Sequence, residues 1–165
     1  MNYSDIIPVI CSSIQCKLYL ELGAQFGSTL NKVTARGIRS VGVDIKKQWT
    51  IGHFEFFEEN TDKFFAHFKE KPDVIFIDGD HSFESVKKDF VNSLNILNEY
   101  GIIFLHDTDP YIESYLSPVY CGDAYKIIDW IKNNYKELDM ITLQADEPGL
   151  TIVKRSNDRR VLKFV

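Results

Sequence analysis

Cysteine is scarce in this sequence, which contains only Cys11, Cys16 and Cys121. Their spacing matches no metal-binding motif, and an odd number does not suit a framework of disulfides. No secretory leader is recognisable, and the apolar residues 6–11 form a run that is too short to cross a membrane. We therefore expect reduced thiols in a cytoplasmic protein that does not enter a membrane.

Positive charge is also in short supply. The chain has 19 Lys and Arg residues against 24 Asp and Glu residues, so its formal net charge is −5. Contact with nucleic-acid phosphates requires clustered cations, and the composition therefore predicts that nucleic acid is not a partner. One basic cluster does occur near the C-terminus, and we interpret it as a solvated tail; it consists of Lys154, Arg155, Arg159, Arg160 and Lys163.

The sequence contains no internal repeat and no low-complexity segment that would divide it. A length of 165 residues, of which 44% are hydrophobic, is sufficient for one domain with a substantial core. We therefore predict a single domain over residues 1–165.

The most informative stretch is residues 73–81, which read Asp-Val-Ile-Phe-Ile-Asp-Gly-Asp-His. Residues 74–77 form an apolar run that is too short for a helix, as in a parallel strand that is buried on both faces. The carboxyl end of such a strand borders the ligand crevice of an open α/β sheet. Asp78, Asp80 and His81 are therefore candidate functional residues, although they could instead only cap the helix that follows.

A second buried strand has the same character. Gly101 breaks the helix that is predicted over residues 82–99, and the apolar residues 102–105 come next. The tripeptide at 106–108, His-Asp-Thr, follows this run. Two neighbouring strands thus deliver polar side chains to one crevice, and this convergence is the strongest functional signal in the sequence.

The first strand is predicted over residues 17–22, and a turn that contains glycine leads from it into a helix. The turn reads Glu-x-Gly-x-x-x-Gly, and the dinucleotide fingerprint Gly-x-Gly-x-x-Gly is absent because Gln25 stands at the second glycine. The next strand, residues 40–43, ends at Asp44, about twenty residues after the turn. An acid at this spacing can accept hydrogen bonds from both hydroxyls of a ribose, although it could also be an exposed side chain beside an ordinary turn.

This turn and the acid after the second strand resemble the nucleoside-binding motif of class I methyltransferases, which use S-adenosylmethionine. The resemblance implies that the turn contacts the methionine part of this cofactor and that Asp44 contacts its ribose. The cofactor-binding residues that it implies are Glu21, Gly23, Ala24, Gln25, Phe26, Gly27, Asp44, Ile45 and Asp78.

The resemblance covers most of the chain and implies an α/β fold. The expected architecture is a Rossmann-like, seven-stranded, mostly parallel sheet in the strand order 3-2-1-4-5-7-6, with helices on both faces and an antiparallel hairpin at the C-terminus. The link 145–148 is so short that the last two strands must run antiparallel. The other predicted elements are strands at residues 54–57, 138–143 and 149–153 and helices at residues 62–71 and 123–134.

The segment after the second strand is short in comparison with this family. Only residues 45–53 lie before the third strand, and a full helix hardly fits there. The residues that bind adenine are therefore left open, with Glu58, Glu59 and Asn60 as candidates. Asn60 or Thr61 could equally cap the helix that follows.

Methyl transfer to an oxygen requires that the acceptor is held close to the cofactor and that it loses a proton. A bound Mg²⁺ lowers the pKa of an acceptor hydroxyl, and carboxylates are among its preferred ligands. Asp78 and Asp107, from adjacent strand ends, could each supply one carboxylate.

The segments Phe-Ile-Asp-Gly-Asp-His-Ser-Phe-Glu-Ser-Val and Gly-Ile-Ile-Phe-Leu-His-Asp resemble closely a subgroup related to macrocin-type and catechol-type O-methyltransferases. This resemblance implies Asp78 and Asp107 as metal ligands, with His106 at a third position where relatives often carry an acid. It also implies a catalytic pair, His81 as the general base and Asp78. An imidazole suits Mg²⁺ poorly, so a metal-free enzyme assisted by His81 is the alternative.

We therefore predict an S-adenosylmethionine-dependent O-methyltransferase that methylates a small-molecule hydroxyl, in a sugar, another alcohol or a phenol, with Mg²⁺. The alternative is a non-catalytic module that binds a nucleoside or a partner on the same fold. A nicotinamide-dependent oxidoreductase is disfavoured by Gln25. The long loop 109–120, with Tyr111, Tyr115 and Tyr120, could line a substrate pocket or pack on a second subunit, so a homodimer that lends a lid is compatible with the sequence.

Overall fold

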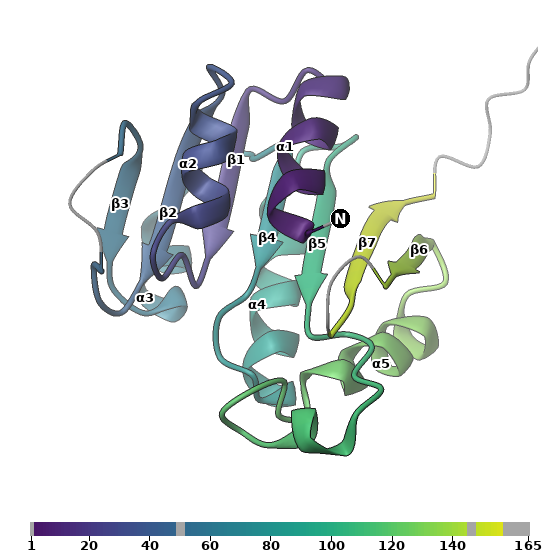
Figure 1. Cartoon of the computed structure of the whole chain (residues 1–165). Helices are drawn as coiled ribbons and strands as arrows, with labels where there is room; N and C mark the ends of the chain where they lie inside the picture. The colour runs from purple at the N-terminus through teal and green to yellow at the C-terminus, as the bar shows by residue number, and fades with distance from the viewer. Residues whose placement is uncertain (1, 49–51, 145–147, 157–165) are drawn as a thin grey trace, which may run out of the picture.

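Seven strands form one sheet in the order β3-β2-β1-β4-β5-β7-β6, as predicted (Figure 1). The computed structural model describes residues 2–48, 52–144 and 148–156 of the chain. The strands from β1 to β5 pair in parallel, and β7 runs antiparallel to both of its neighbours. In chain order the strands are Leu18–Leu22, Arg39–Asp44, Glu55–Glu58, Val74–Ile77, Ile102–His106, Leu138–Leu143 and Leu150–Arg155.

Helices cover both faces of the sheet, which confirms the predicted α/β architecture (Figure 1). On one face α1 (Tyr3–Ser13) and α2 (Ser28–Thr34) pack against the strands. The other face is covered by α3 (Thr61–His67), α4 (Phe83–Ile96) and α5 (Ile127–Asn134). None of the described helices combines the length and the apolar character that crossing a membrane requires.

Side-chain alternation along the central strands explains why they are apolar without interruption. Successive side chains of a strand point to opposite faces. In β4, Ile75 and Ile77 therefore join the core beneath α4, whereas Val74 and Phe76 join the core beneath α1. This burial on both faces explains why β4 is apolar up to its carboxyl end.

Several element boundaries differ from those predicted, for local reasons. Helix α3 ends at His67 rather than at residue 71, because Phe68 turns to an extended conformation and buries its ring in the core. Helix α4 ends at Ile96 rather than at residue 99, and Leu97 is extended and buried. The helix predicted from residue 123 begins as a 3-10 turn over Ala124–Lys126 before α5.

Helix α1 was not predicted, since residues 6–11 were interpreted only as an apolar stretch. Asn2 caps it, because the Asn2 side chain accepts a hydrogen bond from the Ser4 amide at 2.8 Å. In the segment 45–53, which was expected to lack a full helix, residues 45–48 and 52–53 are not helical. Residues 49–51, the hairpin link at 145–147 and the basic residues beyond Arg155 lie outside the described part of the chain.

Candidate active site

Gly23, directly after β1, allows two turns of the crevice to touch. Its φ of +84° lies in the left-handed region. A Cβ atom at this position would lie 2.1 Å from the carbonyl oxygen of Asp78 and 2.5 Å from the Cα atom of Gly79. The turn after β1 and the turn after β4 can therefore meet only with glycine at position 23.

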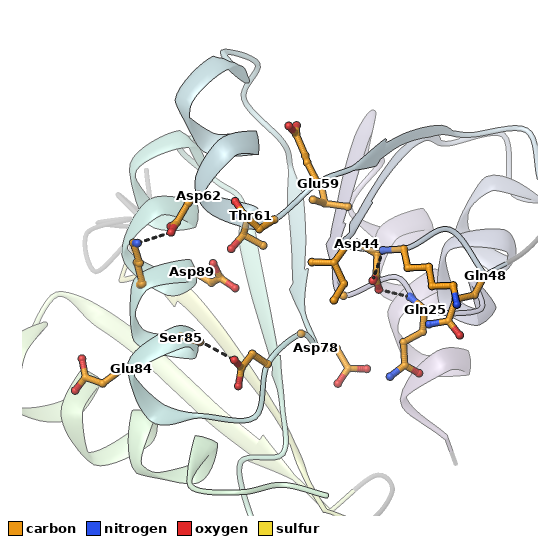
Figure 2. Close-up of a pocket in the computed structure, with 18 residues that line it drawn as sticks. Gln25, Asp44, Gln48, Glu59, Thr61, Asp62, Asp78, Glu84, Ser85 and Asp89 are labelled. Atoms are coloured by element: carbon orange, nitrogen blue, oxygen red, sulfur yellow. Dashed lines mark hydrogen bonds and ion pairs between the residues drawn. The ribbon is translucent and has the colours of Figure 1, made fainter. Parts of the chain in front are cut away.

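Asp44, at the end of β2, is held in place by backbone amides. Its carboxylate accepts a hydrogen bond from the Gln25 amide at 2.8 Å and another from the Lys46 amide at 3.2 Å (Figure 2). Gln25 has a φ of +38°, in the left-handed region, so the backbone of this turn is tightly bent where it contacts the acid. The predicted pairing of a glycine turn with an acid at the next strand end is thus present as a fixed local structure.

A cavity of about 800 Å³ opens beside these residues, within the size range of small-molecule sites. The carboxyl ends of β1, β2, β3 and β4 and one side of α4 line it (Figure 2). Five of the residues predicted to bind the cofactor belong to its wall: Gly23, Gln25, Asp44, Ile45 and Asp78.

Four other residues predicted to bind the cofactor do not belong to the described wall of the cavity: Glu21, Ala24, Phe26 and Gly27. Ala24 is buried, Gly27 precedes α2 as its N-cap, and Phe26 is 67% exposed. Glu21 is buried in β1 and accepts a hydrogen bond from the Tyr19 hydroxyl at 2.6 Å. Burial raises the pKa of Glu21 to about 8 although the Tyr19 hydrogen bond opposes this, and the charge of Asp78 adds to the rise.

The third strand end supplies two of the predicted adenine candidates to the cavity wall, Glu59 and Asn60. Asn60 caps α3 by accepting a hydrogen bond from the Lys63 amide at 2.9 Å, so the capping interpretation is confirmed for this residue. A side-chain oxygen of Glu59 lies 2.6 Å from Nε2 of His67. Glu58 does not belong to the described wall.

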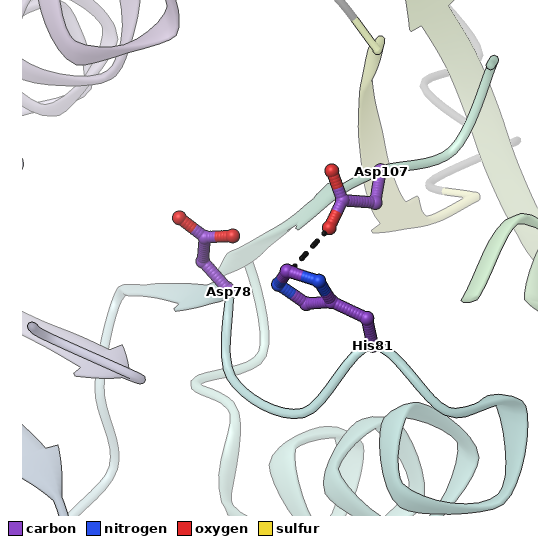
Figure 3. A group of neighbouring side chains, drawn as sticks. All are labelled: Asp78, His81 and Asp107. Atoms are coloured by element: carbon purple, nitrogen blue, oxygen red, sulfur yellow. Dashed lines mark ion pairs between the residues drawn. The ribbon is translucent and has the colours of Figure 1, made fainter. Parts of the chain in front are cut away.

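A second group of functional side chains lies at the ends of β4 and β5. Asp78, His81 and Asp107 each present a ligand atom, and these three atoms lie within 4.8 Å of one another (Figure 3). Nε2 of His81 lies 3.3 Å from an oxygen of Asp107. Asp107 is buried and has a φ of +60°, a strained conformation of the kind that is concentrated at functional sites. The predicted convergence of two strand ends on one crevice is confirmed.

His106 lies beside this group but is not a member of it. Its Nδ1 atom is 3.0 Å from an oxygen of Asp78 and 3.0 Å from an oxygen of Asp107. Burial lowers the pKa of His106, but the two carboxylates outweigh this effect and raise it to about 10. His106 therefore links Asp78 to Asp107 through its Nδ1 atom, whereas His81 is the imidazole that belongs to the group.

Asp80 and Thr108 have structural contacts instead. Asp80 accepts hydrogen bonds from the Ser82 amide at 2.8 Å and from the Ser85 hydroxyl at 3.2 Å, so it stabilises the first turn of α4. These contacts lower the pKa of Asp80, with the Ser82 amide as the main cause. The Thr108 hydroxyl accepts a hydrogen bond from Thr151 of β7 at 2.8 Å.

The loop after β5 is attached to the backbone of His81. The Asp123 amide donates a hydrogen bond to the His81 carbonyl at 3.1 Å, and the Asp123 carboxylate accepts one from the Phe83 amide at 2.7 Å. A Cβ atom on Gly122 would lie 2.4 Å from the same carbonyl. Tyr111 and Tyr120 are exposed on this loop, and the loop does not contribute to the described wall of the cavity.

The cavity wall also contains residues from the beginning of α3 and from one side of α4 to which the sequence analysis gave no role in binding. They are Thr61, Asp62, Glu84, Ser85, Lys88 and Asp89. The spacing of the last four, at positions i, i+1, i+4 and i+5, is the one signal that could have placed them on one side of a helix.

Comparison with known proteins connects this geometry to one family. A family model described as a methyltransferase domain matches residues 20–108, which is more than half of the chain. No curated protein matches the sequence significantly.

Solved structures with the same fold are distant in sequence. A putative caffeoyl-CoA O-methyltransferase from Staphylococcus aureus is 17% identical, with a TM-score of 0.74 over 92% of this chain and 82% of that one. The O-methyltransferase from Bacillus cereus in complex with SAH is 13% identical, with a TM-score of 0.71 and coverages of 92% and 80%. The O-methyltransferase TomG from Streptomyces achromogenes in complex with SAM is 10% identical, with a TM-score of 0.66 and coverages of 93% and 79%.

Proposed function

Because the chain belongs to the methyltransferase-domain family, we propose that it is an S-adenosylmethionine-dependent O-methyltransferase whose acceptor is a small molecule with a hydroxyl group. The names of the similar structures support oxygen as the acceptor atom and S-adenosylmethionine as the methyl donor. A sugar, another alcohol or a phenol would each provide a suitable hydroxyl.

The main observation in support of this proposal is that Asp78 belongs to two neighbouring sites. Asp78 belongs to the wall of the cavity and also to the group with His81 and Asp107. A cofactor in the cavity, with its ribose at Asp44 and its sulfonium near Asp78, would present its methyl group beside that group. The displacement mainly requires that the acceptor oxygen is held close to the methyl group.

His81 has the chemistry and the access of a general base. Its side chain is 27% exposed, and Asp107 lies 3.3 Å from its Nε2 atom, so the ring is oriented by a carboxylate while one edge remains open. In the proposed step the acceptor oxygen loses its proton to His81 and forms a bond to the methyl carbon. The bond from this carbon to sulfur breaks, and S-adenosylhomocysteine leaves.

Asp78 and Asp107 are also suited to a divalent cation. These two carboxylates offer the oxygen ligands that Mg²⁺ or a similar ion prefers, and the neighbouring His106 contacts both of them. Such an ion, when bound, would lower the pKa of the acceptor hydroxyl. We propose Asp78 and Asp107 as its ligands, with His106 contacting both carboxylates rather than the ion.

Calorimetric titration with S-adenosylhomocysteine tests the cofactor site. We expect micromolar binding, and Asp44→Asn should weaken it about tenfold or more because the ribose loses a charged acceptor. Binding should change little between Mg²⁺ and a chelator, whereas methyl transfer to a panel of phenols, sugars and alcohols should require the ion. Failure of both S-adenosylmethionine and S-adenosylhomocysteine to bind would refute the proposal.

His81→Ala separates an enzyme from a module that only binds a nucleoside. The variant should keep the affinity for S-adenosylhomocysteine, because His81 does not belong to the cavity wall. Its methyl transfer should fall by about 10²- to 10⁴-fold, the usual contribution of a general base. Unchanged methyl transfer would remove His81 from the mechanism.

The proposal includes a single domain over residues 1–165, a cytoplasmic location and no nucleic-acid partner. Light scattering tests whether the protein forms a homodimer in which one subunit lends a lid to the site of the other, and a monomer at micromolar concentration would exclude this.

A further inference from the structure

Asp89 is a buried carboxylate in the cavity wall to which the proposed mechanism gives no role. It belongs to α4, its side chain is only 5% exposed, and it borders the cavity together with Thr61 at the start of α3. Figure 2 shows Asp89 and Thr61 beside each other, across the cavity from Gln25 and Gln48.

The surroundings of Asp89 compensate its negative charge only in part. Burial raises its pKa to about 6, and the neighbouring charges of Asp62 and Asp80 add to this rise. A hydrogen bond with Thr61 and the charge of Lys88 act in the opposite direction. The Lys88 ammonium group, however, lies 2.6 Å from Asp62, and among the described residues no cation forms an ion pair with Asp89.

A carboxylate in this situation destabilises a fold unless a ligand completes its contacts. Carboxylates that are buried in a cleft without an ion-pair partner are therefore candidates for ligand recognition. Asp89 borders the cavity although it is buried, and this position agrees with the interpretation.

The positions proposed for the ribose and the sulfonium indicate which part of the cofactor would reach Asp89. With the ribose at Asp44 and the sulfonium near Asp78, the base would extend toward the remaining wall, which contains Ile45, Thr61 and Asp89. Ile45 is apolar and 77% exposed, so it offers a surface on which a flat ring can pack.

We propose that Asp89 recognises the purine base of the cofactor by accepting a hydrogen bond from the amino group of adenine. This inference rests on the proposed function, because it assumes that an adenine nucleoside occupies the cavity. Asp89 thereby selects adenine over a purine that carries a carbonyl oxygen at the same position, since two acceptors would face each other there.

The experiment compares S-adenosylhomocysteine with S-inosylhomocysteine, in which a carbonyl oxygen replaces the amino group. Calorimetry on the wild-type protein should show at least about tenfold weaker binding of the inosine compound. Asp89→Ala should weaken binding of S-adenosylhomocysteine by about 10- to 100-fold and abolish the preference for adenine. Asp89→Asn keeps a carbonyl acceptor and should stay within about threefold of the wild-type affinity for S-adenosylhomocysteine.

Asp129→Asn is the control, since Asp129 is a carboxylate of α5 outside the described cavity wall whose side chain is 86% exposed. This variant should keep both the affinity and the preference. Wild-type preference in Asp89→Ala would overturn the inference and leave Asp89 as a structural link between α3 and α4. Binding of neither compound to the wild-type protein would refute the proposed function and this inference together, whereas binding of both without preference would refute this inference alone.

Discussion

Contact between the turn after β1 and the turn after β4 depends on Gly23. A methyl group at this position meets the backbone of Asp78 and Gly79, which cannot move without displacing β4. Gly23→Ala should therefore destabilise the protein by about 3–5 kcal/mol, measured as the free energy of unfolding in urea.

Gly37→Ala is the control for Gly23→Ala. Gly37 also has a left-handed backbone, with φ at +78°, but a Cβ atom there would meet nothing within 4 Å. The expected loss is about 1 kcal/mol, which is the backbone effect alone. Equal losses at the two positions would show that the contact with β4 is unimportant.

Asp89 should make stability depend on pH in a defined direction. Its pKa rises from 3.8 in the unfolded chain to about 6 in the folded protein, so the folded state binds the proton more tightly. The stabilisation is complete below pH 3.8 and is lost as the pH rises through 6. Asp89→Asn should remove this dependence and raise the free energy of unfolding at about pH 8 by roughly 1–3 kcal/mol. A variant that is less stable than wild type at that pH would contradict the argument.

At the scale of single residues, the sequence could place the acids but not the imidazoles. Asp44, Asp78 and Asp107 follow strands whose apolar runs end plainly, so their positions at the sheet edge were predictable. That His106 contacts both Asp78 and Asp107, while His81 contacts Asp107, follows from packing in three dimensions, which no local pattern of side chains reveals.

Among the elements, the loop after β5 depends on Asp123, which joins it to the start of α4. Asp123→Ala removes the acceptor for the Phe83 amide and loosens the link to the His81 carbonyl. Hydrogen exchange of amides in residues 115–123 should accelerate by about tenfold or more, because their opening free energy falls by roughly the value of a charge-assisted hydrogen bond. The affinity for S-adenosylhomocysteine should not change, since the loop does not belong to the described cavity wall.

Asp129→Ala provides the comparison for Asp123→Ala. The Asp129 side chain is 86% exposed and its one ion-pair partner among the described residues is Lys132, at 3.6 Å. Exchange in the loop should stay at the wild-type rate in this variant. If both variants accelerate it equally, the contact of Asp123 with α4 does not hold the loop.

Helix α1 is an example of an element whose sequence contains a residue that normally disfavours a helix. Pro8 lacks the amide that would donate to the carbonyl of Ser4, and an internal proline normally argues against a helix. The packing of Ile7 and Cys11, both 0% exposed, outweighs this loss. The strand order, by contrast, was predictable, because uninterrupted apolar runs identify the central strands and the resemblance to the family arranges them.

For the molecule as a whole, the net negative charge is concentrated at the cavity. Two lysines line it, Lys46 and Lys88, against seven carboxylates: Asp44, Glu59, Asp62, Asp78, Asp80, Glu84 and Asp89. S-adenosylmethionine carries a positive sulfonium that its demethylated product lacks. The protein should therefore bind S-adenosylmethionine about 3- to 10-fold more tightly than the product at low ionic strength. Titration calorimetry at about 1 M salt should show this preference shrink, and a preference for the product at all salt concentrations would contradict it.

Because one carboxylate, Asp78, belongs both to the cavity wall and to the group with His81 and Asp107, the affinities of the two sites are linked through one side chain. Any factor by which an ion at that group changes the affinity for the nucleoside is also the factor by which the nucleoside changes the affinity for the ion. The small effect that Mg²⁺ should have on nucleoside binding therefore predicts an equally small effect of the nucleoside on Mg²⁺ binding.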